Sequence, residues 1–152
     1  MGIIRLTKKF TFEMAHALSG YDGQCSHIHG HSYILYVTVQ GQPETDVASP
    51  KYGMVIDFTE LKQAVYRLII DRLDHALLLR HDAPLANELQ KTYEKIVQTP
   101  YQPTCENMVQ DFAAILQTAL PPRISLYSVR LHETATSYAE WVNTDAEACP
   151  TA

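Results

Sequence analysis

Residues 25–39 read CSHIHGHSYILYVTV: a cysteine and three histidines at alternate positions lead directly into apolar, β-branched and aromatic residues. Positions i and i+2 of a β-strand point to the same side. From His29 the odd positions form one largely apolar face that ends near residue 40, which predicts a strand with one buried side. The imidazoles of His29 and His31 open that buried face.

A second alternating run precedes this one, between Ile4 and His16, and His16 closes its apolar face. Because only residues 17–28 separate the runs, we expect an antiparallel pair in which His16 meets His29 and His31 across the strands. Three neutral imidazoles would leave one position open on a tetrahedral zinc ion, as in a catalytic site. The alternative is three buried histidines satisfied by ordinary hydrogen bonds. His27 has the same parity, but it falls in the loop and is left out of the predicted site.

Helix signals follow in the middle of the chain. Asp57 and Glu60 have the spacing of a helix N-terminus, and the apolar residues behind them predict a helix over 58–73. Pro103 and Thr104 start a second helix, predicted over 105–120. Between the two helices, 84–91 fits a short helix and 95–98 a short extended piece.

The C-terminal part returns to alternation. From Ile124 we expect a strand whose Tyr127, Val129, Leu131 and Glu133 share one face, followed by a hairpin partner over 138–142. The order strand, strand, helix, helix, strand, strand predicts an α+β fold: a four-stranded antiparallel sheet with two helices on one face. We expect one domain over residues 1–152, with 143–152 as a frayed tail.

Composition excludes several classes of protein. The chain has 152 residues and a formal charge of −5, from 12 Lys+Arg and 17 Asp+Glu, which is the wrong sign for a nucleic-acid-binding surface. No apolar run approaches the roughly 20 residues of a membrane span. The N-terminal residues lack the zones of a signal peptide, so we expect a cytoplasmic protein with reduced thiols.

The three cysteines are an odd number without a repeated spacing, which argues against a disulfide framework. Cys25 lies four residues before His29 and has two interpretations: a zinc ligand, or a catalytic thiol that ionises readily beside a bound cation. A third and weaker interpretation, a redox thiol, lacks a C-x-x-C partner. Cys105 and Cys149 fit small buried residues better.

Two further acidic positions stand out. Asp74 and His75 follow the first predicted helix; they either cap it and face solvent, or form a carboxylate–imidazole pair for acid/base chemistry. Glu133 extends an apolar strand face, where an unpaired carboxylate is costly unless a ligand supplies donors. A heterocycle with a ring N–H beside an exocyclic amine would supply two parallel donors.

Six motifs together resemble the family of 6-pyruvoyl- and 6-carboxy-tetrahydropterin synthases. They occur in the family's order, and the resemblance covers about residues 5–142: FTFEMAH (10–16), CSHIHGHSY (25–33), GMVIDF (53–58), LDHALLL (73–79), PTCEN (103–107) and HETATSY (132–138). The resemblance implies the tunnelling fold, in which subunits join their sheets into a barrel with active sites between chains. A homo-oligomer, a hexamer made as a dimer of trimers, is expected from it.

By the same resemblance, His16, His29 and His31 hold zinc, Cys25 is the catalytic thiol, Asp74 and His75 complete the proton-transfer set, and Glu133 anchors the pterin. Similar enzymes act on 7,8-dihydroneopterin triphosphate. The short C-x₃-H spacing resembles the bacterial enzymes that release acetaldehyde and form 6-carboxy-tetrahydropterin for queuosine synthesis. The alternatives are the 6-pyruvoyl synthase reaction and a non-catalytic zinc- or pterin-binding module. The donor set also suits iron or nickel.

One segment departs from the family pattern. The stretch from Arg80 to Gln102 is longer than in compact members, and LLLRHDAPL (77–85) replaces the usual sequence after the Asp–His pair. This leaves substrate choice at the mouth of the site open. The residues that hold the triphosphate are open too; the sequence offers Lys8, Lys9, Lys51 and Arg80 as candidates.

Overall fold

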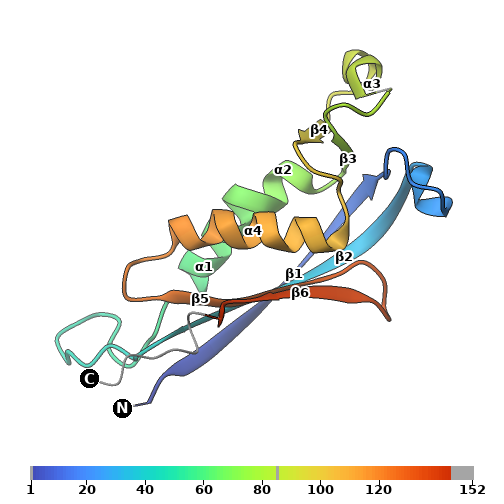
Figure 1. Cartoon of the computed structure of the whole chain (residues 1–152). Coiled ribbons are helices and arrows are strands. Elements are labelled where there is room, and N and C mark those ends of the chain that lie inside the picture. Colours follow the sequence, from blue (N-terminus) through green and yellow to red (C-terminus); the bar gives the residue numbers. More distant parts are fainter. Residues whose placement is uncertain (1, 85, 145–152) are drawn as a thin grey trace.

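The computed structural model describes residues 2–84 and 86–144, and a long β-hairpin forms its centre (Figure 1). Strand β1 (Ile4–His16) pairs antiparallel with β2 (His29–Gly41) along its whole length. These are the strands that the alternation predicts. In the register, His16 lies opposite His29 and Met14 opposite His31, so the three histidines gather at one end of the hairpin.

The sheet has six strands in the order β4-β3-β1-β2-β5-β6, so the predicted four-stranded sheet is wrong. Strands β5 (Ser125–His132) and β6 (Tyr138–Val142) are the expected C-terminal hairpin. The additional strands, β3 (Ala76–Arg80) and β4 (Ile96–Thr99), run parallel and extend the sheet beyond β1. β3 was missed because a short parallel strand reads as a continuous apolar run without alternation.

Helices cover one face of the sheet, as expected. The first predicted helix forms in three consecutive pieces: α1 (Phe58–Val65), the π-helical turn η2 (Tyr66–Ile70) and α2 (Asp71–Leu73). The second is α4 (Cys105–Ala119). Side chains of Asp57 and Thr104 cap α1 and α4 by accepting backbone N–H groups, which explains why both helices start there. A short helix, α3 (Ala86–Thr92), stands apart beside β4 (Figure 1).

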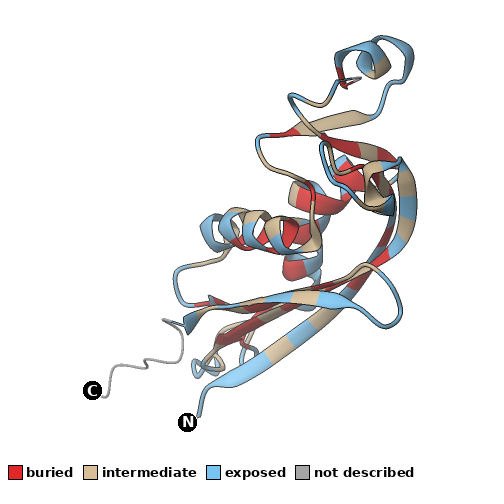
Figure 2. Ribbon diagram, turned by 45° about the vertical axis from the view of Figure 1, so that its right-hand side comes forward, coloured by how far each residue is buried: buried red, intermediate tan, exposed pale blue. Residues whose placement is uncertain are grey.

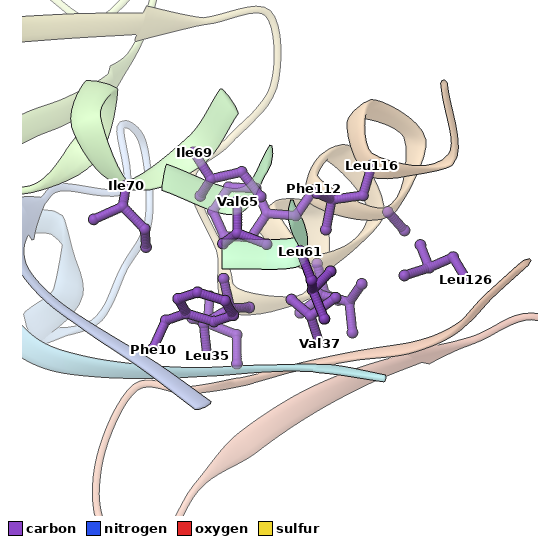
Figure 3. Packing of buried hydrophobic residues seen from close by; sticks show 14 of the residues in the cluster. Phe10, Leu35, Val37, Leu61, Val65, Ile69, Ile70, Phe112, Leu116 and Leu126 are labelled. Atoms are coloured by element: carbon purple, nitrogen blue, oxygen red, sulfur yellow. The ribbon is translucent and has the colours of Figure 1, made fainter. Parts of the chain in front are cut away.

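The core lies between the sheet and these helices. Figure 2 shows buried positions alternating with exposed ones along the long strands. Phe10, Leu35 and Val37 from the sheet pack against residues of α1 and α4 such as Leu61 and Phe112 (Figure 3). Leu35, Val37, Leu61 and Phe112 are fully buried. The opposite sheet face carries polar side chains, so this one-sided core orients the strand faces and thereby the histidines.

One residue departs from the predicted parity. Between Thr38 and Val39 the register with β5 shifts, because Ser128 and Leu126 oppose these two residues and Tyr127 is extra. This β-bulge turns Tyr127 to the outer face, where the Arg5 guanidinium stacks 3.6 Å from its ring centre. The expectation that Tyr127 shares a face with Val129 and Leu131 is therefore wrong.

The C-terminal tail predicted at 143–152 lies, from residue 145 onward, outside the described residues. Asn143 is held at the edge of the sheet: its backbone N–H donates to the Tyr127 carbonyl over 2.9 Å. In the described part of the chain, no helix is both long and apolar enough to cross a membrane.

Candidate metal centre and adjoining cavity

Three imidazoles converge where the β1–β2 hairpin meets the start of α4. Each of His16, His29 and His31 offers one nitrogen to a group whose atoms all lie within 4.8 Å of one another. The strand register explains this convergence, because His29 and His31 are two residues apart on one face and His16 lies opposite them. His27, two residues earlier, is exposed and lies outside the group.

Backbone carbonyls fix the orientation of two of the rings. His16 Nδ1 donates to the Pro103 carbonyl and His29 Nδ1 to the His27 carbonyl, each over 2.8 Å. A carbonyl only accepts, so both protons are on Nδ1 and each neutral ring turns an unprotonated Nε2 inward. Such bonds from the outer ring nitrogen are typical of metal-binding histidines.

The inward nitrogens fit a cation. His16 Nε2 and His29 Nε2 are 3.0 Å apart, and His31 Nε2 is buried without a hydrogen-bond partner among the described residues. Burial lowers the pKa of His16 and of His31, which keeps these rings neutral at pH 7. Neutral imidazoles with lone pairs directed at one point form a donor set that suits zinc.

Glu133, just after β5, directs its carboxylate at the same point. Its Oε1 lies 3.3 Å from His16 Nε2 and 3.8 Å from His31 Nε2. The Tyr33 hydroxyl donates to this oxygen over 3.3 Å, and burial raises the pKa of that phenol. Tyr33 was not among the predicted site residues, although its parity with His29 and His31 places it on the same strand face.

A cavity of about 340 Å³ adjoins the histidines. Its lining includes His16 and Glu133 from the sheet, Cys25 from the short helical turn η1 (Gln24–Ser26), and Cys105 at the start of α4. The structure therefore brings the predicted thiol and the predicted carboxylate together beside the three imidazoles. A concave pocket into which a few polar groups converge is the usual form of a small-molecule site, and this one is lined largely by polar and aromatic side chains.

Cys105 is half-buried rather than fully buried, and its thiol donates to the Leu131 carbonyl over 3.2 Å. Burial raises the pKa of this thiol to about 11, so it stays protonated at neutral pH. No local sequence pattern indicates that Cys105 faces the cavity. Cys149 lies outside the described residues.

Asp74 and His75 are placed elsewhere. Asp74 Oδ2 lies 3.0 Å from His75 Nδ1, and the His75 side chain is 76% exposed. His75 lines a shallow pocket with Glu13, Ala15 and Ser32, whose strand positions have the parity opposite to that of the three histidines, and His31 also borders this pocket. Among the described residues, neither member of the pair lines the cavity of Cys25 and Glu133.

The Asp–His pair is nevertheless held firmly. The Glu13 N–H donates to Asp74 Oδ1 over 2.9 Å, and the His75 N–H donates to the Glu13 carbonyl over 2.6 Å. His75 has a φ of 62°, in the left-handed region that residues other than glycine rarely adopt. Backbone strain of this kind is typical of functional sites.

The four cations considered for the triphosphate do not line the cavity. Lys51 pairs with Glu60 and Arg80 with Asp82, while Lys8 lies over the Phe58 ring. Lys9 lies on the exposed face of β1.

Comparisons with known proteins show which family the chain belongs to. The family model described as 6-pyruvoyl tetrahydropterin synthase matches residues 5–143. The 6-carboxy-5,6,7,8-tetrahydropterin synthase of Haemophilus influenzae is 35% identical, with 91% of this chain and 99% of that protein covered. The 6-pyruvoyl tetrahydrobiopterin synthase of Drosophila melanogaster is 31% identical, with 85% of this chain and 73% of that protein covered.

Solved structures show the same fold. The 6-pyruvoyl tetrahydropterin synthase of Caenorhabditis elegans superimposes with a TM-score of 0.67 at 26% identity, covering 95% of this chain and 98% of that one. An uncharacterised protein of Wolinella succinogenes, WS1659, gives a TM-score of 0.78 at 21% identity, covering 94% and 99% of the two chains.

Proposed function

Because the chain belongs to the 6-pyruvoyl tetrahydropterin synthase family, we propose that it is a zinc-dependent 6-carboxy-5,6,7,8-tetrahydropterin synthase. Its substrates are then 7,8-dihydroneopterin triphosphate and one water molecule, and its products are 6-carboxy-tetrahydropterin, acetaldehyde and triphosphate, on the route to queuosine. The relative from Haemophilus influenzae, matched over 99% of its length, supports this product rather than the pyruvoyl one.

The observation that carries the proposal is the cavity in which a thiol and a carboxylate adjoin three converging imidazoles. His16, His29 and His31 would hold the zinc ion. Bound there, zinc supplies Lewis acidity, which makes a C–H beside a substrate oxygen easier to deprotonate. Among the described residues this group consists of the three histidines without a fourth member, which supports a coordination position that stays open to substrate.

The protein groups supply recognition and proton transfer. The Glu133 carboxylate accepts the ring N–H and exocyclic amine of the pterin as two parallel bonds, which sets the orientation of the ring. Cys25, on the cavity wall, takes a proton from the substrate side chain. His75, oriented by Asp74, delivers or accepts a second proton.

We propose that a second copy of the chain completes this site. His75 lines a pocket with outward-facing residues of β1 and β2 and with His31, whereas Cys25 lines the cavity beside His16 and Glu133. In a homo-oligomer, the pair of one subunit can enter the site of its neighbour. We propose a hexamer, a dimer of trimers, whose sheets close into a barrel; closure would also remove exposed strand edges.

Product analysis tests the proposal. Purified protein is incubated with 7,8-dihydroneopterin triphosphate, and acetaldehyde is measured against substrate loss. Formation of one acetaldehyde per substrate supports the 6-carboxy synthase. Substrate loss without acetaldehyde would instead support the pyruvoyl reaction. This reaction is the second candidate because the Drosophila melanogaster relative is a 6-pyruvoyl tetrahydrobiopterin synthase. If Cys25→Ala and His75→Ala both left turnover unchanged, acid/base catalysis by these two residues would be refuted, whereas no turnover by the wild-type protein would favour a non-catalytic pterin- or zinc-binding module.

A further inference from the structure

The segment Gln102–Pro103 contacts two parts of the candidate site: the histidine cluster and the loop that carries Cys25. The Pro103 carbonyl accepts the Nδ1 proton of His16 over 2.8 Å, and the Gln102 side-chain Nε2 donates to the Ser19 carbonyl over 2.9 Å. Ser19 belongs to the thiol loop, defined here as residues 17–28, which carries Cys25. Two adjacent residues therefore connect a candidate metal ligand with the loop that carries the thiol.

The hydrogen bond from Gln102 to the Ser19 carbonyl lies next to the backbone hydrogen bond that closes the thiol loop. The Leu18 N–H donates to the Cys25 carbonyl over 2.8 Å, so Ser19 follows directly after the residue that fixes Cys25. The Ser19 carbonyl belongs to the Ser19–Gly20 peptide, two peptide planes after the one that carries the Leu18 N–H, so displacing it would disturb this closure through a short stretch of backbone. The position of Cys25 thus depends on what holds Ser19.

Gln102 is itself anchored to a rigid element. Its carbonyl accepts from Asn107 Nδ2 in the first turn of α4 over 3.0 Å, and from the Thr104 N–H over 2.7 Å. The Asn107 N–H donates to the capping hydroxyl of Thr104 over 3.3 Å. The Gln102 side chain therefore transmits the position of the α4 N-terminus to the thiol loop.

The side-chain amide of Gln102 has an energetic cost that an apolar side chain would avoid. Gln102 Oε1 is buried without a hydrogen-bond partner among the described residues, and leaving a polar atom unsatisfied is unfavourable. A methionine of similar length would remove this cost. The feature that distinguishes glutamine here is the Nε2 donor directed at Ser19.

We infer that Gln102 is a positioning residue that holds the Cys25 thiol at a fixed place relative to the histidine cluster. This inference rests on the proposed function, since it gives the thiol loop a part in the same reaction. It also gives a role to the end of the long 80–102 segment. Ala17 and Leu79 pack with Ala86 in a small second core, so the loop keeps an apolar contact when the amide is removed and the variant should fold.

The test uses Gln102→Met, which removes the donor, and Gln102→Glu, which sets a carboxylate against the Ser19 carbonyl. Gln98→Met is the matched control, because its amide bonds only to Asn87 and Gln90 of the neighbouring helix among the contacts described. Five quantities are measured: kcat and KM for dihydroneopterin triphosphate, zinc content, melting temperature, and the rate of Cys25 alkylation by iodoacetamide, which is followed by peptide mass spectrometry.

In both Gln102 variants kcat should fall about tenfold with KM within about twofold, because the thiol loses its alignment while the pterin contacts remain. Cys25 alkylation should change by at least about threefold as the loop loosens. Zinc content should match that of Gln98→Met. Kinetics and alkylation equal to those of the control would overturn the inference, and so would a fall in zinc content that accounts for the loss of activity.

The alkylation measurement needs no substrate. If the wild-type protein does not convert dihydroneopterin triphosphate, the proposed function fails, while the change in Cys25 reactivity still decides whether Gln102 holds the loop.

Discussion

The Nε2 atoms of His16 and His29 lie 3.0 Å apart, although each ring already donates its Nδ1 proton to a backbone carbonyl. Two lone pairs at this distance repel unless a cation or a shared proton lies between them. His16 is only 2% exposed, so water has little access to relieve the repulsion. This contact is the strongest structural reason to expect a metal ion.

We expect about one zinc per chain in protein purified without added metal, measured by elemental analysis. His29→Ala and His31→Ala should each lower the zinc content to background, because two imidazoles hold the ion too weakly. His132→Ala is the control, since His132 contacts Tyr36 and Tyr138 instead. Zinc retained in both site variants would contradict the predicted ligand set.

Glu133→Gln should raise KM for the pterin substrate roughly 10- to 100-fold, because it removes the negative charge and replaces one of the two acceptor oxygens by an NH2 donor. Steady-state kinetics at several substrate concentrations measure this. Zinc content should stay unchanged, and Glu140→Gln, whose carboxylate pairs with Arg130, should behave as wild type. A loss of zinc in Glu133→Gln would instead mark the carboxylate as a metal ligand.

Cys25→Ala and His75→Ala should each be inactive alone and regain activity when mixed with subunit exchange. If a site takes Cys25 from one chain and His75 from its neighbour, random mixing of equal amounts restores about a quarter of wild-type activity. Turnover is measured before and after exchange under mild denaturant. Absence of recovery in mixed oligomers would show that each site is built within one chain.

Asp74→Asn should lose stability mainly at neutral pH. The Glu13 N–H, and then the His75 contact, lower the pKa of Asp74 below its ordinary value of 3.8. The contribution of the carboxylate is therefore complete above pH 3.8 and is lost as the pH falls through the lowered value. In urea unfolding, the free energy of unfolding of Asp74→Asn should lie below that of the wild type by a constant amount between about pH 5 and 7. This difference should disappear in stronger acid. A difference in unfolding free energy that grows in acid would contradict a stabilising role for the ionised Asp74 carboxylate.

Phe112→Ala should lower the free energy of unfolding by about 3–5 kcal/mol, since the fully buried ring fills the space between α4 and the sheet. Tyr93→Ala, at an aromatic side chain that is 60% exposed, should change it by only about 0.5 kcal/mol. Urea denaturation of both variants measures the difference. Similar losses for the two would indicate that the core is not arranged as described.

The sequence predicts the strands and the histidine cluster well because the signals are local. Alternation gives β1 and β2 their bounds, and the register follows from a 12-residue loop between them. Capping residues Asp57 and Thr104 set the starts of α1 and α4. Since β-pairing places His16 opposite His29, the candidate metal centre follows from the same pattern.

The missed features depend on contacts that are distant in sequence. β3 forms by parallel pairing of Ala76, Leu77 and Leu78 with the end of β1, and nothing in its five residues indicates which strand it joins. The outward placement of His75 depends on the Glu13 backbone, 62 residues away along the chain. Periodicity within one segment carries no information about either contact.

The extra residue in β5 allows the two ends of that strand to be oriented independently. Before Tyr127, Leu126 faces the helices; after it, Val129 and Leu131 do, and Glu133 continues their side toward His16. A strand shortened by one residue at this place would have to rotate one end by half a turn. Rotation of the later end would exchange Glu133 for its neighbour, so the length of this strand, as much as its composition, preserves the carboxylate beside the histidines.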